Sequence, residues 1–94
     1  MTIEVHATAD PGGDGWHFSV RVTDGRGTTE HAVRVRRGDV ERLAPGAPDP
    51  TDLVRRSFEF LLAREPKESI LRSFDLPVIG RYFPDYEAAI RGRV

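Results

Sequence analysis

The sequence predicts an α+β domain in which a three-stranded antiparallel β-meander is followed by three to four helices packed on one face of the sheet. Two observations predict this order. Residues 2–37 contain three segments in which apolar and polar side chains alternate, as they do in half-buried strands. From residue 39 onwards the apolar residues recur with the period of a helix, and prolines divide this half into short segments.

Three strands are expected in the N-terminal half, at residues 2–8, 16–23 and 28–37. Two stretches rich in glycine and aspartate separate them, and these residues suit the backbone conformations of hairpin turns. A turn centred on Gly25 and Arg26 places Trp16 opposite Val35, which brings the apolar side chains of both strands to one face. The first hairpin has a looser loop, for which the natural register sets Val5 opposite Phe18.

Helices are expected at residues 39–43, 50–64, 66–73, 76–83 and 84–91. The helix at 50–64 is amphipathic, and its apolar side is expected to cover the apolar face of the sheet. Asp49 is placed to cap this helix, Pro50 suits its first position, and Asp52 lies near the positive end of its dipole. Prolines end the shorter helices and open the next ones, and Asp75 is placed to cap the helix at 76–83.

The length and composition favour one domain, residues 1–94, in the cytoplasm. The chain has 94 residues and no cysteine, so neither disulfides nor thiolate-bound metals are available. No apolar run reaches the ~20 residues that span a bilayer, and the N-terminus lacks the pattern of a signal peptide. The net charge is −1 and is spread evenly over the two halves, whereas nucleic-acid-binding proteins usually carry a basic excess.

The sequence contains no constellation typical of an enzyme. The glycines near residues 12–15 and 25–27 lie in expected hairpin turns and not between a strand and a helix, so they do not form a phosphate-binding loop. All three histidines lie in expected strands, whereas the serines of the C-terminal half lie in expected helices. We therefore predict a protein that is not an enzyme and that needs no cofactor and no metal.

The polar face of the sheet is one candidate binding surface. In the expected registers His6 and His17 lie opposite each other, and Arg21 pairs with Glu30 across the second hairpin. Two solvated histidines are a better reading than a metal site, because the nearest charges are cationic. His31 is different: it belongs to the apolar face and is expected to be partly buried and hydrogen-bonded. The candidate partner-binding residues are His6, His17, Arg21, Arg34, Arg36 and Arg81.

Residues 68–83 superficially resemble a helix-turn-helix. A recognition helix must present several polar side chains to the major groove. The second segment offers only Arg81, is otherwise apolar, and is cut by Pro84. A nucleic-acid-associated regulatory protein, using either the arginines of the sheet face or Arg81, is therefore the alternative to a non-enzymatic protein-interaction module.

The C-terminal third carries more apolar surface than one face of a three-stranded sheet readily covers. Phe60, for example, lies off the main apolar side of its helix. This excess has two explanations. The leftover residues form a self-complementary patch that yields a homodimer through the C-terminal helices, or the terminal helices fold back and bury the residues within one chain.

The C-terminal segment also resembles a known family. The residues that carry the resemblance are EPKESIL at 65–71, FDL at 74–76 and IGRYFPDYE at 79–87. They are similar to the C-terminal signature of a family of small, mostly actinobacterial proteins, and the likeness extends to the expected β-meander and the helix at 52–63. The resemblance implies no activity, cofactor or partner, so no catalytic residues are carried over.

Overall fold

The computed structural model describes residues 1–9, 12–46 and 50–91. Within these ranges it contains four strands and four α-helices, joined in part by two single turns of 3-10 helix. The sheet has the order β1-β2-β3-β4. The elements are β1 (Thr2–Ala9), β2 (Gly15–Asp24), β3 (Gly27–Arg36), α1 (Arg37–Leu43), α2 (Thr51–Leu62), η1 (Lys67–Ser69), β4 (Ser73–Asp75), η2 (Leu76–Val78), α3 (Ile79–Tyr82) and α4 (Tyr86–Arg91).

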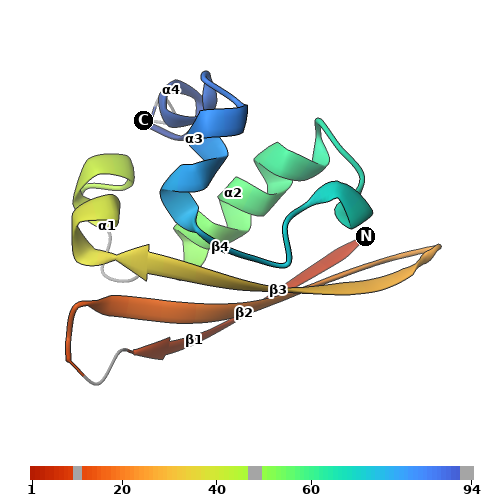
Figure 1. The fold of residues 1–94 in the computed structure, drawn as a ribbon, viewed down its shortest axis with the longest axis horizontal. Coiled ribbons are helices and arrows are strands. Elements are labelled where there is room, and N and C mark those ends of the chain that lie inside the picture. The colour runs from red at the N-terminus through yellow and green to blue at the C-terminus, as the bar shows by residue number, and fades with distance from the viewer. Residues whose placement is uncertain (10–11, 47–49, 92–94) are drawn as a thin grey trace.

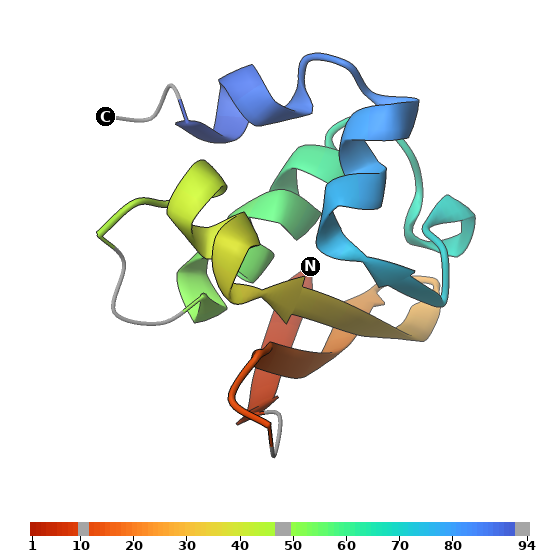
Figure 2. The ribbon, with the colours of Figure 1, turned by 60° about the vertical axis from the view of Figure 1, so that its left-hand side comes forward.

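The molecule has two layers, with the sheet on one side and the helices on the other (Figure 1). The turned view shows the same separation, with α2 between the sheet and α4 and with α3 beside α2 (Figure 2). The core lies between the layers. Its sheet side is formed by alternate residues of β2 and β3, and its helix side by the apolar side of α2. The α+β class and the packing of helices on one face are therefore as predicted.

The β2–β3 hairpin has the predicted register. Trp16 pairs with Val35 and Phe18 with Val33. Phe18, Val33 and Val35 are buried, whereas Arg36 at the end of β3 is exposed. A shift by one residue would turn this apolar set toward solvent, so the hydrophobic pattern itself selects the register.

The predicted register of the β1–β2 hairpin is wrong by two residues. Val5 pairs with Val20 and not with Phe18, which lies opposite Ala7. A shift of two residues leaves every side chain on the same face of the sheet, so the alternation of apolar and polar residues cannot distinguish the two registers. The conformation of the loop between the strands decides the register, and the length of the loop alone does not specify that conformation.

The sheet has a fourth strand where the sequence predicted a helix over residues 66–73. Lys67–Ser69 form only a single 3-10 turn, after which the chain is extended and β4 pairs in parallel with β3. The sheet is therefore mixed and not purely antiparallel. Phe74 lies opposite Val33 and packs its ring against Phe58 at 6.1 Å, and this burial favours the extended chain over a helix.

The remaining helices differ from the prediction mainly at their ends. The helix α1 begins at Arg37 because the Asp39 carboxylate accepts a 2.9 Å hydrogen bond from the Arg36 N–H at its N-terminus. The helix α2 begins at Thr51, directly after the buried Pro50, and the predicted cap Asp49 lies outside the described residues. Asp75 does not cap the segment that follows, because its side chain instead lies 3.6 Å from Arg36.

The last helix is docked onto α2 by a buried pair of hydroxyl groups. Ser57 donates a 2.7 Å hydrogen bond to the Leu53 carbonyl, so its oxygen accepts the hydrogen bond from the Tyr86 hydroxyl at 2.7 Å. Burial raises the pKa of Tyr86 to about 12, although the bond to Ser57 opposes this shift. Phe60 packs edge-on against Tyr86 and Phe83 and is buried. The C-terminal helices therefore cover part of the apolar excess within one chain.

Candidate functional site

An open apolar groove of about 310 Å³ lies in the C-terminal half and is lined by residues of α2, β4, η2 and α3 and of the segments that join them. The elements α2, β4 and α3 are labelled in Figure 1. Apolar and aromatic side chains provide most of its surface. Ten residues line the groove: Leu61, Glu65, Ser69, Ile70, Leu71, Phe74, Val78, Ile79, Tyr82 and Phe83. A concave, mainly apolar surface with a few polar groups is the usual form of a binding site.

Local sequence explains why the chain opens here. Pro66 is extended, with φ −70° and ψ 158°, and its ring prevents α2 from continuing. Ile70 is extended as well, so the chain leaves α2, makes one tight turn and crosses to β3 without forming another α-helix. Pro77 lies in the first turn of η2, where a proline is tolerated, and α3 follows directly at Ile79. These separate short segments leave a hollow that one continuous helix would fill.

Two hydrogen bonds hold the side of the groove against the sheet. The Ala32 N–H donates to the Arg72 carbonyl at 2.7 Å, and His31 Nδ1 bonds the Leu71 carbonyl at 2.8 Å. Because a carbonyl only accepts, His31 Nδ1 carries the proton, and Nε2 accepts from the Thr29 hydroxyl at 2.9 Å. His31 is buried and hydrogen-bonded, as predicted, and its role here is to position Leu71.

Lys67 fixes the turn that precedes this side of the groove. Its side chain is only 1% exposed, and its Nζ lies 2.9 Å from an Asp24 oxygen in the β2–β3 hairpin. The neighbouring carboxylate of Glu68 is its second partner. Hydrogen bonds to Glu68 and then Asp24 raise the pKa of Lys67 above 10.5, although burial opposes the shift. The only lysine of the chain is therefore held as a cation and is no candidate for a base or nucleophile.

The contacts of Lys67 also change the pKa values of its two carboxylate partners, Asp24 and Glu68. The hydrogen bond from Lys67 lowers the pKa of Asp24 below 3.8, with a further contribution from the Arg26 N–H. It also lowers the pKa of Glu68 below 4.5. A lowered folded-state pKa gives stability above the unfolded-state pKa, and this stability is lost as the pH falls through the folded value. The raised pKa of Lys67 gives stability that is lost only at strongly alkaline pH.

We expect Lys67→Met to make the stability of the protein less dependent on acid pH. The substitution removes the ion pairs but keeps an apolar stem, so the variant should be less stable than wild type near neutral pH. The difference should shrink as the pH falls from about 7 to about 3, because the stability that comes from the lowered pKa values of Asp24 and Glu68 starts to be lost below their ordinary values of 3.8 and 4.5. Urea unfolding of both proteins at about pH 7 and pH 3 measures it. An equal difference at both values would contradict the assignment.

The matched control is Glu30→Gln. This substitution removes a carboxylate from an ion pair with Arg21 in which the two side chains are 54% and 64% exposed. Exposed pairs contribute little to stability, so the control should stay close to wild type at both pH values.

The groove is apolar at its rim as well as inside. Leu71 is 46% exposed and Tyr82 is 66% exposed, and Met1 is the remaining large apolar side chain that is exposed within the described ranges. Glu65 supplies the carboxylate of the groove and Ser69 a hydroxyl. The Glu65 carboxylate makes no ion pair or hydrogen bond with the described residues. The groove can therefore bury apolar groups and receive one positive charge.

Five of the six predicted site residues lie on the open face of the sheet, and Arg81 lies in α3. His6 pairs with Ser19 and His17 with Thr8, so the predicted opposition of the two histidines is wrong. The cause is the register shift of two residues. His17 lies opposite Arg34 instead, as predicted for β2 and β3. In the described part of the chain, no group of three or more acidic or histidine side chains is arranged to hold a metal ion.

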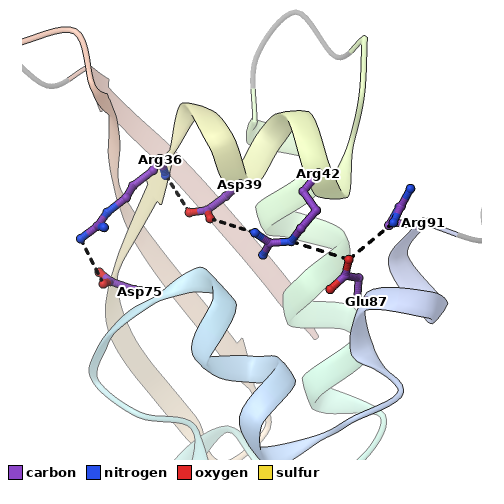
Figure 3. A network of polar contacts seen from close by, with 6 residues as sticks. All are labelled: Arg36, Asp39, Arg42, Asp75, Glu87 and Arg91. Carbon is purple, nitrogen blue, oxygen red and sulfur yellow. Dashed lines mark hydrogen bonds and ion pairs between the residues drawn. The ribbon is translucent and has the colours of Figure 1, made fainter.

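The other predicted arginines of the sheet face are engaged with acids. Arg21 lies 3.4 Å from Glu30, which confirms that predicted pair. Arg36 lies 3.6 Å from Asp75 and begins a chain of contacts that runs through Asp39 to Arg42 (Figure 3). Arg42 then approaches Glu87 of α4 at 3.6 Å, where Arg91 lies on the other side (Figure 3). These contacts join the sheet to α1 and α4.

Arg36 and Arg81 are brought together by the fold, although 45 positions separate them in the sequence. Both line a hollow of about 210 Å³ that also contains Asp39 and Asp75. Arg81 makes no ion pair with the described residues, whereas Arg36 and both acids have partners. Two cations and two anions leave this hollow without a net charge, so it is a weaker candidate for an anion site than the sequence suggested.

Sequence reasoning did not identify Glu65, Leu71 and Lys67 as residues of interest. Leu71 belonged to the expected helix at 66–73, Glu65 lay between two expected helices, and neither carried a separate signal. The one available signal was Ser73-Phe74-Asp75, whose polar–apolar–polar order is that of a strand. If these three residues had been interpreted as a strand, the residues before them would have been predicted to cross from α2 to the sheet.

No protein-family model matches the chain, no curated protein matches it, and no solved structure matches it. The resemblance of residues 65–87 to a family of small actinobacterial proteins therefore stays a prediction. None of the helices in the described ranges is long and apolar enough to cross a membrane.

Proposed function

We propose that this protein is a non-enzymatic protein-interaction module of the cytoplasm and that the groove is its binding surface. One observation carries the proposal: Leu71 and Tyr82, two large apolar side chains left exposed by the fold, lie on the rim of the same apolar hollow. Exposed apolar patches around a concave site mark interaction surfaces more often than scattered single residues do. Tyrosine is also among the residues that contribute most to binding energy in interfaces.

The positions of the ionisable groups support binding over catalysis. The buried cation Lys67 is neutralised by two carboxylates, and the buried His31 uses both ring nitrogens in hydrogen bonds that position the chain. General acid–base catalysis needs a titrating group within reach of a substrate. The groove offers the Glu65 carboxylate and the hydroxyl groups of Ser69 and Tyr82, and these suit orientation of a bound segment.

Nucleic-acid binding is the less supported alternative. Arg21 and Arg36 lie in ion pairs with Glu30 and Asp75, and this reduces the positive potential of the sheet face. Arg81 shares its hollow with two acids. A salt-dependent shift of labelled DNA or RNA at low ionic strength would favour the alternative over the groove.

Selection from a random peptide library on the immobilised protein tests the proposal. We expect enrichment of peptides with apolar residues at helical or alternating spacing and with a lysine or arginine that meets Glu65. Tyr82→Asp should weaken binding of the selected peptides by about 30-fold or more, as expected for loss of an interface anchor worth at least about 2 kcal/mol.

The matched control is Ala88→Asp, which adds the same charge at an exposed position of α4 outside the groove. This variant should bind the selected peptides as wild type does. Selected peptides that bind wild type, Tyr82→Asp and Ala88→Asp equally would show that the groove is not the binding surface, and the proposal would fail.

A further inference from the structure

We infer that the groove is filled by a second copy of this chain, in a twofold dimer. The inference rests on the proposed function, because it names the partner that the groove accepts. It explains why the groove combines a hollow with exposed apolar side chains and with a carboxylate that has no ion-pair partner among the described residues.

The apolar part of the surface is complementary to itself. Leu71 and Tyr82 line the groove and are also largely exposed, so each copy presents both a hollow and the side chains that can enter one. In a twofold interface the same patch is used on both copies, and a residue that contacts a second residue is matched by the reverse contact. Tyr82 of each copy can then cover the groove of the other.

The charged side chains near the groove are also complementary between two copies of the chain. Glu65, the acid of the groove, has no ion-pair partner among the described residues. Arg72 and Arg81 are exposed, directly adjoin Leu71 and Tyr82 in the sequence, and make no side-chain ion pair with the described part of the chain. In the proposed dimer, one of these arginines would pair with Glu65 of the other copy when Leu71 and Tyr82 enter its groove. The surface thus carries both signs of charge that a twofold contact requires.

A weak dimer requires only a small part of the molecular surface. Standard interfaces bury about 800 Å² per partner, and weaker ones about 600 Å². The described residues expose 5729 Å², so an interface of the smaller size would use roughly a tenth of it. With two apolar anchors per copy we expect a dissociation constant in the micromolar range.

A second route to association lies at the opposite edge of the sheet. The strand β1 is an edge strand of eight residues and can pair with another chain. This route does not involve Tyr82, so substitution in the groove distinguishes the two dimers.

Sedimentation equilibrium of the full chain between about 10 μM and 1 mM tests the inference. The wild type should approach twice its 10.5 kDa mass as the concentration rises. Tyr82→Asp and Glu65→Arg should weaken the dimer by about 30-fold. Ala88→Asp should not change it. Circular dichroism and thermal melts of each variant establish that the fold is retained.

Charge reversal provides the sharper test. Glu65→Arg combined with Arg81→Glu, or with Arg72→Glu, should restore the dimer to within a few-fold of wild type, and the restoring pair identifies the arginine that meets Glu65. Failure of both double variants to restore it would overturn the proposed pairing. A dimer that persists in Tyr82→Asp would overturn the groove as the interface and indicate the β1 edge.

The outcomes for this inference and for the proposed function are distinguishable. A wild type that stays monomeric at about 1 mM but binds selected peptides through Tyr82 overturns only the second copy as partner. A wild type that neither dimerises nor binds peptides through Tyr82 overturns both.

Discussion

Phe58→Ala is expected to lower the free energy of unfolding by about 3–5 kcal/mol, the largest effect of any single substitution proposed for this protein. Phe58 is fully buried, and its ring packs 5.4 Å from the His31 ring and 6.1 Å from the Phe74 ring. It therefore joins α2 to β3 and β4. A chain of this length has a total stability of only about 5–15 kcal/mol, so the variant should be close to unfolding. Urea denaturation measures the change.

The control for this prediction is Phe58→Leu. It keeps most of the apolar volume and should cost no more than about 1.5 kcal/mol. Because Phe74 lines the groove, the alanine variant should also lose peptide binding before it loses secondary structure. A cost below about 1 kcal/mol for the alanine variant would mean that the rings do not form the centre of the core.

Gly15→Ala is expected to destabilise the protein by about 1–3 kcal/mol or more, although it adds only one methyl group. A Cβ atom at this position would lie 2.9 Å from Arg36 Cα and 3.1 Å from the Val35 carbonyl carbon. Both are backbone atoms of the paired strand, which cannot move away as a flexible side chain would. The substitution should force β2 and β3 apart at the point where Gly15 pairs with Arg36. Thermal unfolding measures the loss.

The control for Gly15→Ala is Gly38→Ala, which we expect to stabilise the protein. Gly38 lies in α1, and a Cβ atom there would have no neighbour within 4 Å. Replacing a glycine inside a helix by alanine should stabilise the protein by about 0.5–1 kcal/mol. If both alanine variants changed stability in the same direction, the contact between the backbones of β2 and β3 would not be the cause at Gly15.

The candidate binding surface lies where the chain changes direction most often. The segments around the groove are short, and long-range contacts hold them in place: Lys67 to the β2–β3 hairpin and His31 to the Leu71 carbonyl. Such a surface is rigid because the core fixes it, and a rigid surface loses little conformational entropy on binding.

The sequence by itself determined the features that local pattern encodes. Alternating side chains defined β1, β2 and β3 and their buried faces, and the apolar match of Trp16 with Val35 fixed one register. The helical period located α2, and the apolar excess of the C-terminal third left open whether its residues form an exposed patch or are buried within one chain. The structure buries Phe60 and Tyr86 and leaves Leu71 and Tyr82 exposed.

Only the tertiary structure decided which distant segments meet. The β1–β2 register could not be predicted because a shift of two residues preserves both faces. The strand β4 is favoured because Phe74 packs, partly buried, against the buried Phe58, and this contact outweighs the local preference for a helix. For the same reason the groove, and the encounter of Lys67 with Asp24, could not be predicted. A local period specifies which face of an element is buried, but the partner that covers it is chosen by packing over the whole chain.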